Sequence, residues 1–358
     1  MSVRLTRVLS IAFLLAVVCP AISDTTLRWQ LKEGDRFLIS TESTTTITTT
    51  TRRGDADAAT DTDKREVKAV RRLIVSKSPA DADVFDAEIR FESIDVTSTS
   101  GGRTMHYVAR REGDKKHVEV IIKSRHAMMA GRDVKELMEK FASNLLNQRV
   151  TVQVGRDGSI KGLPSGDGAL YGNLPAQTPV TKAMLHAMKK LMPADEIPAM
   201  LLADLFITVQ GPALPVGGQW QGKASIVEAA GLRLSRDSTF TLESLKQVDG
   251  RTVATIRETG DYHAVADRRA EVLSDLIADE LRHTKRPAKV ALSFKPAIAQ
   301  GKSTIRFDAA AGHPISIECE KLTLPLTGEM EVTTGDRATK VAIEAAAEIT
   351  STTTWMKE

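Results

Sequence analysis

Cysteine is almost absent from this chain of 358 residues, which contains only Cys19 and Cys319. Cys19 lies in an N-terminal segment that we expect to be removed, so the remaining chain cannot form an internal disulfide. Cys319 occupies the apolar side of the alternating stretch 315–320, which predicts a buried cysteine on a strand rather than a nucleophile. Stability must therefore come from packing.

Aromatic residues are also scarce, at 4% of the chain, which disfavours a carbohydrate-binding module that stacks sugars on rings. The 7 histidines show none of the H-x-H, H-x-x-x-H or H-E-x-x-H spacings that place two imidazoles on one metal. The sequence also lacks a G-x-S-x-G nucleophile elbow and a P-loop. We therefore predict no catalytic residue, no cofactor and no metal site.

Two stretches resemble binding loops without the frame that such loops require. Five acids have the spacing of calcium-loop positions: Asp55, Asp57, Asp61, Asp63 and Glu66. Thr60 stands where that loop needs glycine, and basic residues surround the acids, so the run 52–66 predicts a mobile, charged hairpin loop. The glycine-rich run 155–172 lacks the Gly-Lys-Ser/Thr of a phosphate loop and indicates a hairpin turn and a linker.

The N-terminus has the three parts of a secretory signal peptide. Arg4 and Arg7 form a basic region, residues 8–18 are almost all apolar, and Ala21-Ile22-Ser23 supplies the small residues of a cleavage site. The apolar run is short for the roughly 30 Å core of a bilayer. An uncut membrane anchor and a lipoprotein signal ending at Cys19 are the alternatives, and Pro20 is unfavourable for the second.

Charge and hydropathy narrow the possible partners. The formal net charge is +3, and removal of residues 1–23 takes away two arginines and leaves a nearly neutral chain. Nucleic-acid binders need a basic face, so we predict no nucleic-acid partner. No later apolar stretch approaches the length of a membrane span, so we predict none in the mature chain. The sequence thus predicts an exported protein of the periplasm or the extracellular space.

Residues 24–161 predict a first β-rich half. Alternation at Leu27, Trp29 and Leu31 predicts a half-buried strand. The threonine-rich run 41–51 predicts a long polar strand with Ile47 as its one apolar contact, because threonine is β-branched; a disordered tract is the alternative. Further strands are predicted at 67–76, 84–96, 103–110 and 116–123 and in a hairpin over 150–160.

Helices are predicted beside and after this first half. One amphipathic helix is expected near 133–147, where Asp133 and Glu136 match a capping box before an apolar stripe: Val134, Leu137, Met138, Phe141 and Leu145. Residues 162–212 predict a Gly/Pro-rich linker over 162–179 and then two short helices, through 184–191 and about 197–206.

Residues 213–358 predict a second β-rich half. Strands fit 219–228, 232–245 and 252–264, a helix fits 267–283, and a hairpin turns at 309–313. A last strand is predicted over 341–355, with a helix through 345–347 as the competing interpretation. The fold class is therefore α+β and mainly antiparallel, with two curved β-rich halves that each carry one amphipathic helix and are joined by a short helical segment.

The two halves also suggest an internal duplication. Residues 31–37, LKEGDRF, match residues 214–220, LPVGGQW, at three of seven positions by class, and each opens a half. The number of residues between matched positions is smaller for Gly158 and Gly312 than for Phe37 and Trp220. A true repeat would keep this number constant, so chance resemblance is the alternative.

Three motifs together carry a resemblance to a known family. They are L-x-W-x-L-K-x-G-D-R-F at 27–37, L-P-V-G-G-Q-W at 214–220 and F-D-x-x-x-G-H-P-I at 307–315. This pattern resembles an uncharacterised family of exported bacterial proteins, a domain of unknown function, although Gly218 stands where that family often has Asp. The resemblance implies an exported, β-rich fold over most of the mature chain and carries over no catalytic residue.

These observations favour an exported, non-catalytic binding or structural-interaction protein with an unknown envelope or extracellular partner. The alternative is a carrier that holds an apolar ligand, such as a lipid or a lipoprotein, between curved sheet and helices. A hydrolytic enzyme is the third hypothesis. A large apolar cavity would favour the carrier, and converging Asp, His or Ser groups in a cleft would favour the enzyme.

The signal-peptide assignment makes a direct prediction. We expect the exported protein to begin at Asp24, because Ala21 and Ser23 provide the small residues before the cut. N-terminal sequencing of exported protein checks this, and a chain that begins at a lipid-modified Cys19 would contradict it.

Overall fold

The computed structural model describes residues 26–52, 58–76, 84–101, 103–113, 115–123, 131–166, 169–191, 193, 202, 205–209, 213–229, 232–265, 270–271, 274–275, 278, 289–295 and 297–358. Its first strands and helices, up to residue 191, are β1 (Arg36–Arg52), β2 (Ala59–Val75), β3 (Val84–Ser100), β4 (Arg103–Glu112), β5 (Lys115–Lys123), α2 (Arg132–Asn147), β6 (Arg149–Gly155), β7 (Ile160–Gly166), η1 (Ala169–Tyr171) and α3 (Pro179–Leu191). The later strands are β8 (Gln219–Ala229), β9 (Leu232–Val248), β10 (Arg251–Val265), β11 (Lys289–Phe294), β12 (Ala297–Asp308), β13 (His313–Thr334) and β14 (Arg337–Lys357).

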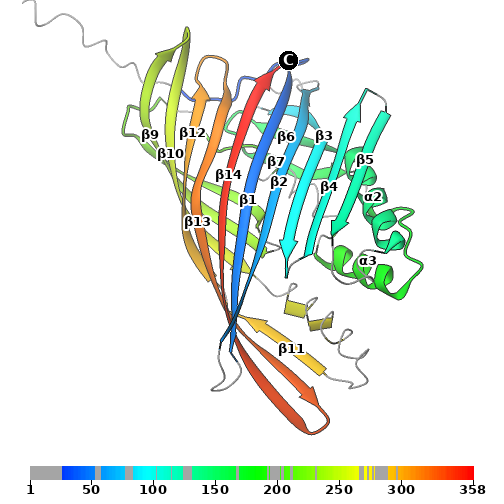
Figure 1. Ribbon diagram of the computed structural model, residues 1–358. Coiled ribbons are helices and arrows are strands. Elements are labelled where there is room, and N and C mark those ends of the chain that lie inside the picture. Colours follow the sequence, from blue (N-terminus) through cyan, green and yellow to red (C-terminus); the bar gives the residue numbers. More distant parts are fainter. Residues whose placement is uncertain are drawn as a thin grey trace, which may run out of the picture.

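The strands form one large, strongly curved antiparallel sheet (Figure 1). Its order is β5-β4-β3-β2-β1-β14-β13-β12-β10-β9-β8, with the β6–β7 hairpin on β3 and β11 on β13. The mainly antiparallel β architecture expected from the sequence is confirmed. The strands assigned to two halves are nevertheless continuous, because β1 pairs with β14 along its length, from Phe37↔Lys357 to Arg52↔Ala342.

The threonine-rich run is the central strand β1, as the sequence predicts. It pairs with β14 on one side and β2 on the other, and Ile47 packs against an apolar cluster. The prediction that 52–66 is a loop is wrong over its second part, since 59–66 belong to β2. Threonine pairs explain the difference: Thr50 and Thr60 hydroxyls hydrogen-bond at 3.2 Å across the strands, and β-branched residues favour this pairing.

The N-terminal segment, residues 26–32, is not the strand that its alternation predicts. Leu27 and Trp29 are fully buried and Arg28 and Gln30 are exposed, but the backbone makes no ladder. Instead the Trp29 N–H donates to the Arg156 carbonyl (2.9 Å) and the Gln30 N–H to the Gly312 carbonyl (3.0 Å). The alternation therefore records burial against the sheet, not strand pairing.

Trp29 lies at the centre of an aromatic cluster, which we define as Trp29, Phe37, Phe85, Phe206, Phe307 and Trp355. Ring centroids lie 5.3 Å from Trp29 for Phe206 and 5.5 Å for Trp355, and the indole Nε1 donates to the Ile207 carbonyl at 3.0 Å. These rings come from β1, β3, β12, β14 and two crossing segments. The cluster thus marks the inward face of the sheet and fills one end of it.

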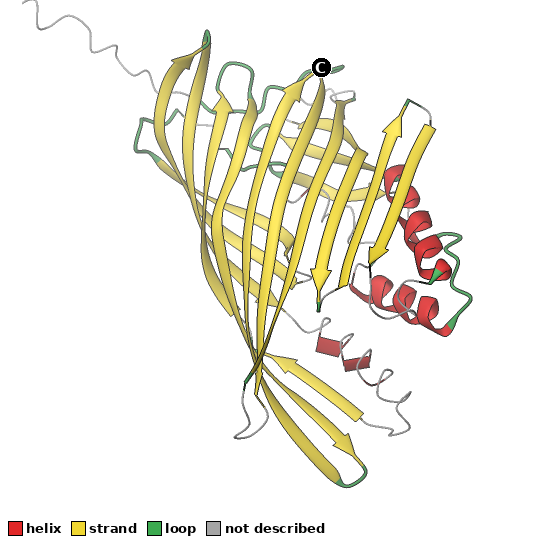
Figure 2. Cartoon of the chain, in the orientation of Figure 1, coloured by secondary structure: helices red, strands yellow, loops and turns green. Residues whose placement is uncertain are grey.

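The helices α2 and α3 lie near the β5 edge of the sheet (Figure 1 and Figure 2). α2 packs its predicted apolar face against β3, β4 and β5, but Leu146 is buried more deeply than Leu145. The predicted capping box is wrong: the N-cap is Gly131, without a side-chain cap. Asn144 Nδ2 donates to the carbonyls of Leu170 and Gly172, which fixes η1 beside α2.

Other connections differ in part from the sequence predictions. The linker expected over 162–179 begins later, because β7 extends to Gly166 and η1 follows. Of the helix expected at about 197–206, Leu202 is helical and Phe206 is not. The helix predicted at 267–283 is present wherever its residues are described, at 270–271, 274–275 and 278. No helix among the described residues is long and apolar enough to cross a membrane.

The turns before β1 and β8 have the same local geometry. Gly34 and Gly217 have φ angles of 85° and 88°, a region that favours glycine. The Gly34 N–H donates to the Val75 carbonyl and the Gly217 N–H to the Leu242 carbonyl, so each turn is bonded to the next strand of its hairpin. Three residues later, Phe37 and Trp220 are buried, as the sequence predicts.

We expect Phe37→Ala and Trp220→Ala each to lower the free energy of unfolding by about 3–5 kcal/mol, because each removes a buried ring. Trp220 also stacks on Phe240 at 5.4 Å and donates from Nε1 to the Thr208 carbonyl. Urea unfolding measures the effect. Met356→Ala is the control, since that side chain is 62% exposed and should change little. A Trp220→Ala variant that unfolds like the parent protein would contradict the core assignment.

Asp35 makes a second, pH-dependent prediction. Burial raises the pKa of the Asp35 carboxyl. The Lys357 ammonium at 2.6 Å and the Lys32 N–H together lower this pKa by more than burial raises it, so the net pKa lies below the ordinary 3.8. A depressed carboxyl pKa stabilises the fold above about pH 4, and this stabilisation is lost as the pH falls through the folded-state value.

We therefore expect Asp35→Asn to cost about 1–2 kcal/mol at neutral pH and little in strong acid. Unfolding titrations at pH 7 and below pH 3 measure the difference. A loss of stability that is equal at both pH values would show that the charge of Asp35 does not matter.

Candidate functional site

One row of inward-facing residues crosses the centre of the sheet. Directly opposed residues in an antiparallel ladder point to the same face, so the register defines the row strand by strand. Across β2, β1, β14, β13, β12 and β10 its members are Val67, Ser43, Ser351, Cys319, Ser303 and Glu258. Four of these six side chains are small and bear a hydroxyl or a thiol, although they lie at the middle of the inward face.

A hollow of about 470 Å³, which we call the central hollow, lies on this row. The row contributes Val67, Ser43, Ser351 and Cys319 to its lining. Their neighbours along the chain complete it: Glu42, Thr44, Glu66, Lys68, Thr350 and Thr352. Because serine and cysteine side chains are short, they leave open the space that leucine or phenylalanine would fill.

Cys319 is half-buried rather than buried, which corrects the sequence prediction. Its thiol donates to the carbonyl of Glu320 at 3.2 Å. The strand alternates as predicted, but the opposing residues Ser303 and Ser351 are too small to cover the sulfur from either side. A thiol on the wall of a hollow is therefore a chemical reporter of whatever enters it.

Towards the aromatic cluster, the central hollow is followed by buried polar groups. Thr41 and Thr353 share a hydrogen bond of 3.0 Å across β1 and β14, and Arg71 Nη2 donates to Thr41 Oγ1 at 2.5 Å. All three side chains are buried. In the opposite direction lies an apolar cluster that includes Leu322, Leu324, Leu326, Ala347 and Ile349. The central hollow thus has polar groups on one side and aliphatic groups on the other.

A buried ion pair ends the row on the β10 side. Glu258 forms an ion pair with Arg236, with Nε at 3.1 Å, accepts from the Ser238 hydroxyl at 2.6 Å, and is almost fully buried. Arg236 also donates to the Tyr262 hydroxyl at 3.3 Å. Burial raises the pKa of Tyr262 to about 12, so the phenol stays protonated at neutral pH. These contacts satisfy Glu258 within the protein and indicate a structural role for it.

Tyr262 depends on glycine in the adjacent strand. A Cβ built at Gly301 would lie 2.4 Å from Cε2 of the Tyr262 ring, so only glycine lets the ring lie over β12 at this point. This ring belongs to the aliphatic cluster beside the central hollow. The glycine thus fixes the packing of Tyr262 within this cluster.

The described acids of the calcium-like spacing do not form one site. Asp61, Asp63 and Glu66 lie along β2, and Glu66 pairs with Lys64 at 2.6 Å; Asp55 and Asp57 lie outside the described residues. Throughout the described part of the chain, no group of three or more His, Cys, Asp or Glu side chains could hold a metal. His106 contacts Asp95 at 2.9 Å, and His126 and His283 also lie outside the described residues.

The row itself was missed by sequence reasoning. Ser43 and Ser351 are 308 positions apart, and only the β1–β14 register makes them neighbours. The available signal was a small hydroxyl or thiol residue at an inward position of each of four long strands, β1, β14, β13 and β12.

Comparisons with known proteins identify no relative. No family model and no curated protein matches the chain. Among solved structures, lipovitellin, reported for its lipid–protein interactions, has a TM-score of 0.29 at 8% identity, covering 89% of this chain and 25% of its own. An outer membrane channel from Pseudomonas putida F1 has a TM-score of 0.19 at 7% identity, covering 94% and 99%. Pseudomonas putida OprB has 0.19 at 7%, covering 90% and 93%. This chain spans a quarter of lipovitellin, and TM-scores this low establish neither a family nor a function.

Proposed function

We propose that this chain is an exported, non-catalytic binding protein that holds an uncharged amphipathic ligand in the central hollow. The observation that carries the proposal is the row of small hydroxyl and thiol side chains at the middle of the inward face, between buried polar groups and an aliphatic cluster. A volume of about 470 Å³ lies within the range of small-molecule sites.

The chemistry of the lining defines the ligand class. Ser43 and Ser351 can each donate or accept one hydrogen bond, while Leu322 and Ile349 provide aliphatic surface beside them. A molecule with one or two hydroxyl or ester groups on an apolar chain satisfies both kinds of surface. A strongly charged ligand fits less well, because Glu42 and Lys68 pair with each other at 3.3 Å.

Two further arguments support the remaining parts of the proposal. Export rests on the signal peptide at residues 1–23 and on the resemblance of the three sequence motifs to exported bacterial proteins. A non-catalytic role rests on the lining of the central hollow, where the Cys319 thiol bonds to a carbonyl and no described histidine stands beside it as a base.

The alkylation rate of Cys319 tests the proposal directly. Cys319 is the single cysteine after residue 23, so N-ethylmaleimide reports on the central hollow alone. We expect a monoacylglycerol at saturating concentration to slow the alkylation of the native protein by about tenfold or more.

A filling variant and its control complete the test. Ser351→Phe should weaken monoacylglycerol binding by about tenfold in calorimetry, because the ring occupies the hollow. Thr354→Phe places the same ring on the opposite face of β14, where the side chain is exposed and lies outside the lining, and should leave binding unchanged. Unchanged alkylation in the presence of the lipid, or equal binding by both variants, would overturn the proposal.

A further inference from the structure

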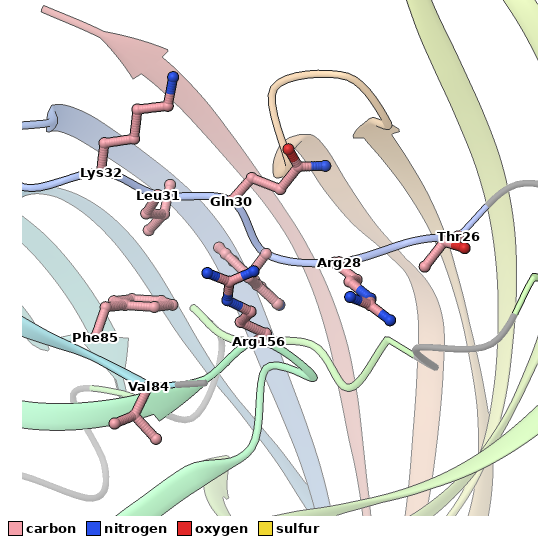
Figure 3. Close-up of a pocket in the computed structure, with 9 residues that line it drawn as sticks. Thr26, Arg28, Gln30, Leu31, Lys32, Val84, Phe85 and Arg156 are labelled. Atoms are coloured by element: carbon pink, nitrogen blue, oxygen red, sulfur yellow. The ribbon is translucent and has the colours of Figure 1, made fainter. Parts of the chain in front are cut away.

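A second hollow, of about 510 Å³, lies beside the N-terminal segment, and we call it the end hollow. It shares no lining residue with the central hollow, so it is a separate candidate. Residues 26 and 28–32, the start of β3 and the turn after β6 line it, as shown in Figure 3. The three segments are far apart in sequence; the Trp29 N–H donates to the Arg156 carbonyl, and the start of β3 pairs with the end of β6 (Val84↔Gly155).

Two arginines from different segments border the end hollow. Arg28 lies on the N-terminal segment and Arg156 in the β6–β7 turn, and both side chains are exposed. Lys32 is a third lining cation, but in Figure 3 it points away from the two arginines. Arg28 and Arg156 are therefore the side chains on which the inference depends.

The backbone around both arginines is fixed. Trp29, next to Arg28, is buried and bonded to Ile207, while the Asp157 carbonyl, next to Arg156, accepts from the Val209 N–H at 2.8 Å. A Cβ at Gly158 would lie 1.9 Å from the Ile207 carbonyl oxygen, so the turn can pack here only with glycine. Because the backbone is already fixed at both arginines, the protein loses less conformational entropy when a ligand binds the two side chains.

The lining contains no carboxylate, and two acids close to it in the chain, Asp35 and Asp157, have their own partners. Asp35 is bonded to Lys357 and to the Lys32 N–H. Burial raises the pKa of the Asp157 carboxyl, but hydrogen bonds from Ser159 lower it by more. The net pKa of Asp157 is therefore below that of an ordinary aspartate. The positive charge of the two arginines is therefore not neutralised within the lining of the end hollow.

The floor of the end hollow is apolar. Leu31 and Val84 are partly buried and line it, above the buried rings of Trp29 and Phe85, whose centroids lie 6.5 Å apart. Guanidinium groups over an apolar floor suit a ligand that carries an anion on a hydrocarbon body, because phosphate and carboxylate accept paired N–H bonds from arginine.

We propose that the end hollow binds the anionic head, phosphate or carboxylate, of an amphiphile whose chain lies on Leu31 and Val84. Arg28 and Arg156 hold the head from two sides. The amphiphile comes either as a free single-chain molecule or as a lipid in a membrane surface, and the same head-group chemistry serves both.

The experiment compares Arg28→Gln/Arg156→Gln with a control of equal charge, Arg103→Gln/Arg337→Gln, in the full mature protein. Arg103 and Arg337 are exposed and lie outside both hollows. One arm measures binding of dodecyl phosphate below its micelle concentration, with dodecanol as the uncharged analogue. The other arm measures flotation with vesicles of phosphatidylglycerol and phosphatidylcholine against vesicles of phosphatidylcholine alone.

We expect the parent protein and the control to prefer the anionic probe in at least one arm, and the Arg28/Arg156 variant to lose that preference by about tenfold or more. A preference seen only with dodecyl phosphate identifies a free ligand, and a preference seen only with anionic vesicles identifies a membrane surface. No anion preference in either arm, or equal loss in both double variants, overturns the inference. Protection of Cys319 by a monoacylglycerol is independent of these arginines, so failure here leaves the proposed function standing.

Discussion

Pairing of the first and last long strands is the constraint on which the rest of the structure depends. β1 and β14 share a continuous antiparallel register at the centre of the sheet, and the other long strands extend outward from this pair. Without it, the strands before residue 124 and those after residue 218 would have open edges where they now join. The same register sets Ser43 against Ser351, so the central hollow exists only because this pair forms. Fold and candidate site thus have one physical origin.

The aromatic cluster complements this pairing from the inward side. Trp29 contacts rings from β3, β12 and β14 and bonds to the segment at Ile207, so one side chain joins parts of the chain that the ladder keeps apart. In a chain with few aromatic residues, their concentration at one end leaves the middle of the inward face to smaller side chains. This uneven distribution of side-chain volume leaves the central hollow open.

Local patterns in the sequence predicted most of the elements. Alternation and β-branching located the long strands, including the threonine-rich β1, because both effects act between near neighbours. The α2 helix followed from its apolar stripe. β11 was missed, since six residues with half-buried alternate positions give a weak signal, and its role depends on pairing with a distant part of β13. The extended N-terminal segment was taken for a strand because burial against a sheet produces the same alternation as a place within one.

The candidate site could not be predicted, for a related reason. Its residues are ordinary serines and a cysteine whose meaning depends on which strands become neighbours, and antiparallel register over 300 residues is not encoded locally. Cys319 illustrates the limit: the alternation placed it on the correct face, but its half-exposure follows from the small size of Ser303 and Ser351 on the adjacent strands. The capping box at Asp133 failed similarly, because Gly131 begins the helix in a geometry that the motif alone does not determine.

Native mass spectrometry of the protein purified from its own source tests the central claim most directly. If the inward face holds a ligand, the folded protein should carry a non-covalent mass that is released on unfolding and that fragments as an amphipathic molecule. A folded protein that shows only the mass of its polypeptide, and gains none after incubation with a lipid extract of the same source, would contradict the account.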